Sequence, residues 1–146
     1  TPSAEVYQRL IKNFARKVEE NISTKKSLAK MTEALRVVYY DIASRVLEEQ
    51  KQIIPCYAGV SNVHINYDGG VWPCCVLGYE KEMGNLREYG YDFQELWHSE
   101  KAIEIRKYIK EKNCACPLAN QAYSNELMHL PTLVKAGLKM IEFSRR

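Results

Sequence analysis

The 146-residue sequence lacks several features that would place it in a simple class. It has no run of about 18 apolar residues, so it predicts no membrane-spanning helix. It has no secretory signal pattern and no low-complexity tract, and its hydrophobic content is high enough for a folded core. It also lacks an initiator methionine. We therefore expect the chain to be a fragment of a longer protein or a processed chain.

The sequence also has little net charge of either sign. Its 21 basic and 18 acidic residues leave a formal charge of +3. The two signs are interleaved along expected helices, as at Lys107, Lys110 and Glu111, which is typical of solvated helix faces. No stretch matches a nucleic-acid-binding module. We therefore expect a cytoplasmic protein with no nucleic-acid or membrane partner.

Apolar residues spaced three or four positions apart predict helices on both sides of a central region. The first two helices are expected to pair in antiparallel fashion, and Pro55 is expected to end the second near Ile54 because helical geometry is disfavoured before a proline. The expected helices cover residues 3–22, 25–53, 93–98, 100–112, 118–129 and 132–143.

Local capping signals complete this helical pattern. Thr1 and Pro2 are expected to begin the first helix, because proline lacks the amide donor that a first turn leaves unused. Ser23 or Thr24 is expected to cap the second helix through its hydroxyl.

Residues 63–72 have the spacing of strands instead of helices. Apolar and polar side chains alternate over residues 63–67, which predicts a strand. Residues 68–70, Asp-Gly-Gly, favour a tight turn because glycine adopts positive φ readily. Residues 71–72 would then begin the returning strand of the hairpin. We therefore expect an α+β fold that is mostly helical, with a small antiparallel hairpin at a cysteine-ligated metal site.

The length of the hairpin loop decides which side chains share a face. A two-residue loop places Cys74 on the face of Ile65, Tyr67 and Trp72, and turns Cys75 the other way. A three-residue loop would change this cross-strand pairing. A second turn is expected at residues 83–86.

The five cysteines are the residues most indicative of function. Their odd number and the lack of a secretory signal disfavour a disulfide scaffold. Four cysteines lie at expected element boundaries in two distant groups, which suits a site of four thiolates. Structural zinc sites usually contain Cys-x2-Cys pairs, which this chain lacks, so a cubane iron–sulfur cluster is slightly favoured over zinc. The four candidate ligands are Cys56, Cys74, Cys114 and Cys116.

The remaining candidate residues have simpler interpretations. Cys75 is expected to be a small buried apolar residue, with the role of a substitute ligand as the alternative. Tyr67 and Trp72 are expected to pack around the site. A redox dithiol at Cys114 and Cys116 is disfavoured, because no thioredoxin-like strand–helix context surrounds it. The three histidines, His64, His98 and His129, have no ligand spacing and are expected to have ordinary surface or core roles.

As a set, these motifs resemble the SPASM/twitch auxiliary domains of radical SAM enzymes. The similarity begins with Cys56, twelve residues, Gly69, four residues and Cys74. It continues through the return strand, the turn at residues 83–86, the helix at residues 93–97 and the cysteine pair that follows the next helix. It extends over roughly residues 56–125, with residues 1–55 as a helical hairpin or linker region and residues 126–146 as a C-terminal helix.

The resemblance implies a cofactor and a place in a larger enzyme. The expected cofactor is one [4Fe-4S] cluster held by the four candidate ligands, because the sequence has too few cysteines for the two clusters of full SPASM domains. The final pair in this family is usually Cys-x2-Cys, whereas this chain has Cys-x-Cys, which keeps Cys75 as a substitute. The core Cys-x3-Cys-x2-Cys motif, which binds the SAM-cleaving cluster, is absent.

The resemblance also implies a function for the expected cluster. A radical SAM core barrel would be the partner in cis, and the parent would be an oxidoreductase or maturase acting on an unknown substrate, such as a peptide or small molecule. The cluster would serve electron transfer or substrate positioning, and the chain alone would cleave no SAM. A zinc-stabilised structural or interaction module is the alternative.

Overall fold

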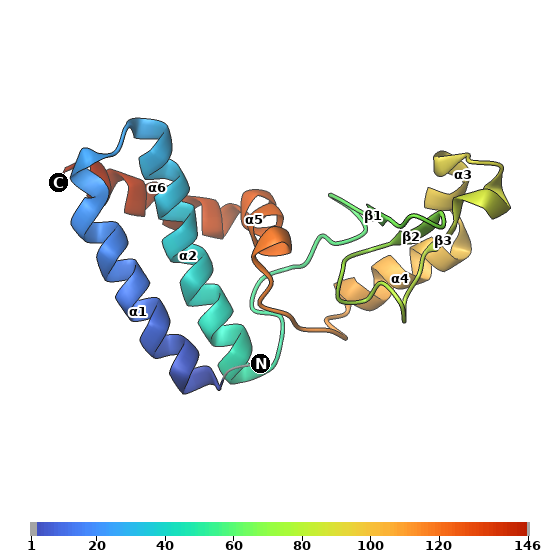
Figure 1. Ribbon diagram of the computed structural model, residues 1–146, viewed down its shortest axis with the longest axis horizontal. Coiled ribbons are helices and arrows are strands. Elements are labelled where there is room, and N and C mark those ends of the chain that lie inside the picture. The colour runs from blue at the N-terminus through green and yellow to red at the C-terminus, as the bar shows by residue number, and fades with distance from the viewer. Residues whose placement is uncertain (1–2, 146) are drawn as a thin grey trace. The chain divides into compact units, whose positions relative to one another are not determined.

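The computed structural model describes residues 3–145, and the chain divides into two compact units. The helical unit comprises Thr1–Ile54 and Ala115–Arg146, and the hairpin unit comprises Pro55–Cys114 (Figure 1). Within residues 3–145, none of the helices is both long enough and apolar enough to cross a membrane.

The helical unit is built around its longest helix, α2. Helices α1 and α2 run antiparallel side by side, as expected, and α6 packs against α2 (Figure 1). Its elements are α1 (Ala4–Asn21), the 3-10 turn η1 (Ile22–Thr24), α2 (Ser27–Glu49), α5 (Ala119–Met128) and α6 (Leu130–Ser144).

Two apolar clusters hold these helices together. One joins α2 to α6 through Val38, Ile42, Val46 and Ala136. The other joins the η1 turn, α2 and α6 through Ile22, Ala34 and Phe143. Both clusters lie on the inner face of α2, where side chains recur at helical spacing.

The helix ends correct two expectations, both of them about α2. Ser3 caps α1, its hydroxyl accepting from the Val6 amide at 3.4 Å, while the expected start at residues 1–2 lies outside the described residues. Lys26 is the N-cap of α2 without a side-chain hydrogen bond, so the expected cap at residues 23–24 was wrong. Helix α2 ends at Glu49 and not near residue 54, because Gln50 adopts φ 51° and its amide closes onto the Val46 carbonyl.

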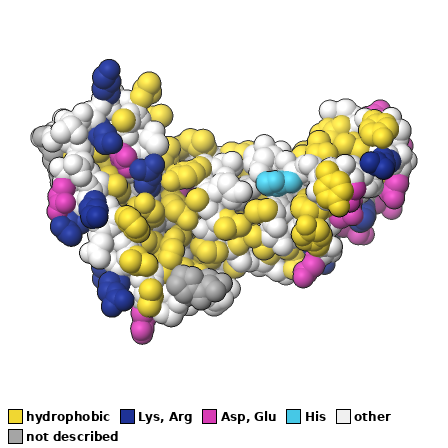
Figure 2. Space-filling model, in the orientation of Figure 1, with side chains coloured by type: hydrophobic (Ala, Val, Ile, Leu, Met, Phe, Trp, Pro, Cys, Tyr) yellow, Lys and Arg dark blue, Asp and Glu magenta, His cyan; other side chains and the backbone are white. Residues whose placement is uncertain are grey.

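Apolar side chains of the helical unit also reach its surface (Figure 2). The expected stripe of α1 is only partly covered, and α6 has an exposed row that continues over about three turns. These side chains are Val6, Leu10 and Phe14 on α1 and Leu130, Val134, Leu138 and Ile141 on α6.

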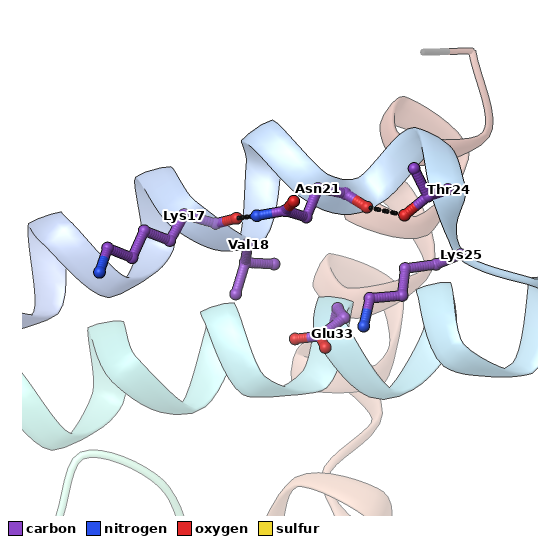
Figure 3. A pocket seen from close by; sticks show the side chains of 6 residues that line it. All are labelled: Lys17, Val18, Asn21, Thr24, Lys25 and Glu33. Atoms are coloured by element: carbon purple, nitrogen blue, oxygen red, sulfur yellow. Dashed lines mark hydrogen bonds between the residues drawn. The ribbon is translucent and has the colours of Figure 1, made fainter.

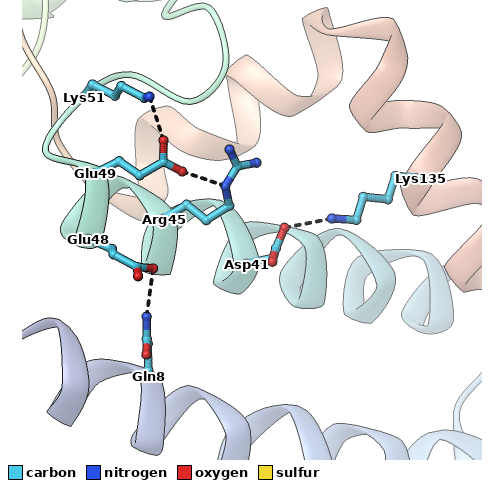
Figure 4. Close-up of polar contacts among 7 residues, drawn as sticks. All are labelled: Gln8, Asp41, Arg45, Glu48, Glu49, Lys51 and Lys135. Atoms are coloured by element: carbon cyan, nitrogen blue, oxygen red, sulfur yellow. Dashed lines mark hydrogen bonds and ion pairs between the residues drawn. The ribbon is translucent and has the colours of Figure 1, made fainter.

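Polar contacts link α2 to α1 and to α6 (Figure 4). Glu48 accepts from Gln8 of α1 at 3.2 Å, and Asp41 pairs with Lys135 of α6 at 2.7 Å. Because these groups are largely exposed, each pair contributes about 0–1 kcal/mol. Apolar packing therefore determines how these helices associate.

A polar pocket lies where α1 turns into α2 (Figure 3). The turn is fixed by two hydrogen bonds around Asn21, which donates to the Lys17 carbonyl at 2.9 Å and accepts from Thr24 Oγ1 at 2.8 Å. Charges of both signs face the pocket, from Lys17, Lys25 and Glu33. Its lining contains no cysteine or histidine.

The hairpin unit contains a three-stranded antiparallel sheet in the order β1-β2-β3. Its elements are β1 (His64–Ile65), β2 (Gly70–Trp72), β3 (Gly84–Asn85), the 3-10 turn η2 (Leu86–Tyr89), α3 (Phe93–Trp97) and α4 (Glu100–Lys110). The region that was expected only as a second turn thus supplies the third strand.

The register of the hairpin corresponds to the three-residue loop that was the alternative, and not to a two-residue loop. Ile65 pairs with Val71 and His64 with Trp72. Trp72 therefore shares a face with His64 and not with Ile65. The loop is longer because the Asn66 amide donates to the Gly70 carbonyl at 2.8 Å, outside residues 67–69. Residues 73–80 form turns, so the expected strand-face assignment does not apply to the cysteines at positions 74 and 75.

Candidate metal centre

The segment that follows Cys56 is tied to the segment that precedes Cys74. The Gly59 amide donates to the Pro73 carbonyl at 3.1 Å and to the Asn62 carbonyl at 3.0 Å. Gly59 has φ +72°, and a Cβ at this position would lie 3.2 Å from the Pro73 Cβ. A glycine is favoured here by both the backbone angle and the close approach. The hydrogen bond therefore brings together two loops that each carry a candidate ligand.

Cys74 begins a tight turn at the end of the hairpin. Its side chain is buried, and its sulfur accepts from the Leu77 amide at 3.5 Å. An amide directed at a thiolate stabilises the negative charge on sulfur, which is one way in which a protein tunes an iron–sulfur site.

Cys114 follows the end of α4, where Tyr108 fixes the chain. The Asn113 amide donates to the Tyr108 carbonyl at 3.3 Å, and the Tyr108 hydroxyl donates to the Asn113 carbonyl at 2.7 Å. Lys112 adopts φ 63°, which turns the chain away from the helix axis. Helix α4 itself is positioned by its N-cap Ser99 and by Ile105 and Ile109 in the core.

Three of the candidate ligands contact one apolar core in the hairpin unit. Cys74 belongs to the buried cluster, and Cys56 and Cys114 pack against it, partly buried. Among residues 3–145, no three His, Cys, Asp or Glu side chains are placed to bind a single metal ion. A cubane cluster binds each cysteine at a different iron, so its ligands enclose more space than those of one zinc ion.

Cys116 belongs to the helical unit, in the irregular segment before α5. The next residue, Pro117, accepts a hydrogen bond through its carbonyl from the Tyr39 hydroxyl of α2 at 2.9 Å. Ala115 and Pro117 also line a pocket with residues of α1 and α2, including Val46. The segment around Cys116 is therefore placed against α2.

Two expectations about residues near the site were wrong. Cys75 is exposed, because it occupies an outward position of the turn that buries Cys74. Tyr67 lies at the tip of the hairpin loop and is 94% exposed, so it does not pack around the site. Trp72 is half-buried and packs against Tyr79, with ring centroids 4.6 Å apart.

The histidines have ordinary contacts where the structure records them. His98 Nδ1 lies 2.8 Å from the Gln94 carbonyl, and His129 Nδ1 lies 2.7 Å from the Thr132 hydroxyl. Both contacts are local to helix ends.

Sequence reasoning missed Arg106, a partly buried charged residue of the hairpin unit. Arg106 Nη2 donates to the Trp97 carbonyl at 2.7 Å, and the guanidinium lies 4.8 Å from the centroid of the Trp97 ring. Its Nη1 is buried without a hydrogen-bond partner among the described residues, and burial lowers the pKa of this group. The position that a Gly59 Cβ would take is 3.5 Å from Arg106 Cγ, so α4 reaches the loop after Cys56. Neither strand alternation nor helical spacing in the sequence predicts such a contact between distant residues.

Comparison with protein families gives a match that coincides with these loops. The family is described as the SPASM iron–sulfur cluster-binding domain, and it matches residues 56–117. This segment is a SPASM-type domain. The match begins at Cys56 and ends just after Cys116, so all four candidate ligands lie within it. Comparisons with curated proteins and with solved structures gave no match.

The donor set of the SPASM segment fits the group that its family binds. Iron–sulfur clusters are held by cysteine thiolates, and the segment provides five cysteines. The buried sulfur of Cys74 has both an apolar surrounding and an amide donor. Cys74 therefore has the surroundings of an iron–sulfur ligand.

Proposed function

We propose that this chain supplies an auxiliary [4Fe-4S] domain to a radical SAM enzyme in the cytoplasm. The observation that carries the proposal is the Gly59–Pro73 hydrogen bond within a SPASM-type segment, which joins the loops of Cys56 and Cys74. The cluster ligands would be Cys56, Cys74, Cys114 and Cys116.

The residues of the hairpin unit would set the environment of the cluster. The core around Cys74 excludes water from one side, and the Leu77 amide would partly neutralise the charge on sulfur. Both effects act on the reduction potential of an iron–sulfur centre. When bound, a [4Fe-4S] cluster supplies one-electron transfer.

Ligation by four cysteines leaves no open coordination position for a substrate. We therefore favour electron transfer over direct substrate binding. The SAM-cleaving barrel would be the partner in cis, and it would determine the substrate, a peptide or a small molecule. The 146-residue chain alone is expected to cleave no SAM.

Purification under anaerobic conditions tests this proposal. The expected result is broad visible absorption near ~400 nm with about four irons and matching sulfide per chain, as a cysteine-ligated cubane requires. Stoichiometric zinc with no iron would contradict the cluster and support a structural zinc site. Preparation in air is unsuitable, because zinc can replace a cluster that oxygen has destroyed.

A further inference from the structure

Helix α6 has apolar side chains on two sides. On its inner side, Ala136 and Phe143 belong to the two apolar clusters of the helical unit. Its outer side carries a row of large side chains that are each 51–71% exposed, namely Leu130, Val134, Leu138 and Ile141. A helix that is apolar all round is normally buried all round. This outer row therefore fits a second apolar surface.

No charged side chain belongs to the outer row. The charged side chains of α6 form ion pairs with α1, with α2 and with each other. Lys135 lies 2.7 Å from Asp41, and Lys139 lies 3.2 Å from Glu19 and 3.0 Å from Glu142. The outer row is therefore electrically neutral, and a neutral apolar surface complements it best.

A depression lies beside the outer row at Gly137. None of the described heavy atoms lies within 4 Å of the position that a Cβ would take there, so the space above this glycine is open. Val134 and Ile141 border the depression, since residues three or four positions apart are neighbours on a helix surface. Glycine inside a helix is unfavourable, but it lets another surface approach the backbone closely.

The spacing of this surface is symmetric about Val134. Leu130 and Leu138 lie four residues to either side, and the exposed Pro131 and Gly137 lie three residues to either side. In an antiparallel pair with a two-fold axis at Val134, Leu130 would face Leu138 of the second copy. The proline ring would likewise face the glycine depression of the second copy. A two-fold interface requires such a self-complementary patch, whereas an unrelated partner does not.

We propose that the outer row of α6 binds a second copy of this chain, as an antiparallel helix pair around a two-fold axis at Val134. The proposal uses only the helical unit, so it does not depend on the cluster. Each side of a standard interface supplies about 20–30 residues, far more than this row. The dimer is therefore expected to be weak and to form as the protein concentration rises.

Sedimentation velocity of the full chain over about 1–500 µM measures this association. A thiol reductant and anaerobic conditions exclude dimers linked by disulfides. The wild-type chain should shift from monomer to dimer as its concentration rises. Val134→Glu sets two carboxylates against each other at the axis and should weaken the dimer roughly ten-fold or more.

The matched control for this substitution is Val6→Glu. It adds the same charge at an exposed valine of α1 and should leave the association unchanged. A wild-type chain that stays monomeric at every concentration would overturn the proposal. So would an unchanged dimer in Val134→Glu, or an equal weakening in Val6→Glu.

Gly137→Ala separates association from folding. Alanine favours a helix and its methyl group fits the open space, so the thermal midpoint of the dilute monomer should rise by about 2–4 °C. The same methyl group fills the depression and should weaken the dimer roughly ten-fold. If the dimer formed as readily as in the wild-type chain, the close approach at this glycine would be wrong.

A pair of opposite charges tests the antiparallel direction. Leu130→Lys alone sets a cation against Leu138 of the second copy and should weaken the dimer. Adding Leu138→Glu gives that cation a carboxylate across the axis, twice in each dimer, and should restore most of the association at low salt. Within one helix the two positions lie about 12 Å apart, too far to pair. No recovery in the double variant would overturn the antiparallel arrangement.

Discussion

At the scale of single residues, Glu126 has the most unusual environment in the helical unit. Its side chain is 0% exposed, and neither carboxylate oxygen has a hydrogen-bond partner among the described residues. Burial disfavours the charged form and raises the pKa of Glu126 to about 7. The carboxyl is therefore neutral at mildly acidic pH and ionises within the physiological range.

This shift predicts a pH-dependent stability. The pKa in the folded state lies above the ordinary value of 4.5. The stabilisation from protonation is therefore complete below pH 4.5 and is lost as the pH rises through about 7. Between pH 6 and 8 the free energy of unfolding should fall by about 1 kcal/mol. Urea denaturation followed by far-UV circular dichroism measures this change, and Glu126→Gln should flatten it. An equal slope in that variant would assign the pH dependence to other groups.

Gly59 provides a second test at this scale. Gly59→Ala should lower the stability of the hairpin unit by about 1–2 kcal/mol from its left-handed backbone alone, and further through the contact with Pro73. Gly90→Ala is a matched control, because it has φ +57° but no heavy atom within 4 Å of its Cβ position. Equal losses of stability in the two variants, measured by thermal denaturation, would show that the close approach to Pro73 adds nothing to the cost of the substitution.

At the scale of elements, the sequence predicts those features that depend on residues close together in the chain. Helices α3 and α4 begin at the expected residues because Asp92 and Ser99 accept hydrogen bonds from amides two or three residues on. Strand β3 has only two residues, too few for a period, and was expected as a turn. The hairpin register was left open between a two-residue and a three-residue loop because alternation alone does not determine the length of a loop, and the structure has the three-residue loop.

Contacts between distant residues could not be predicted in this way. The cysteines are visible in the sequence, but the Gly59–Pro73 hydrogen bond depends on the fold between them. Helix α5 reverses the usual pattern by burying Gln121, Asn125 and Glu126, whereas Leu127 is exposed. Hydrophobic spacing would predict the opposite orientation for this helix.

The N-cap of α4 can be tested directly. Ser99 Oγ accepts from the Ala102 amide at 3.2 Å, and Ser99→Ala should cost about 1 kcal/mol of stability because that amide loses its acceptor. Ser99→Asp keeps an acceptor for this amide and should retain most of the wild-type stability. Hydrogen exchange at the Ala102 amide reports the local effect. Unchanged protection in the alanine variant would mean that the cap does not hold the helix start.

At the scale of the whole molecule, the two units should respond differently to metal removal. Both units have apolar clusters, but three of the four proposed ligands pack in or against the cluster of the hairpin unit, whose strands are short. Cysteine-ligated metals can contribute on the order of 10 kcal/mol to folding. Removing iron should therefore speed amide exchange in residues 55–114 before it affects α1, α2 and α6. Uniform acceleration along the chain would contradict this division.

The iron content of single cysteine variants tests the central claim most directly. Each cysteine is replaced by alanine in turn, and iron per chain is measured after identical anaerobic reconstitution. Cys75→Ala is the internal control, because its side chain is exposed. The account predicts wild-type iron in Cys75→Ala and a clear loss in the variants of Cys56, Cys74, Cys114 and Cys116. Full iron retention in Cys56→Ala, or a comparable loss in Cys75→Ala, would contradict the proposed ligand set.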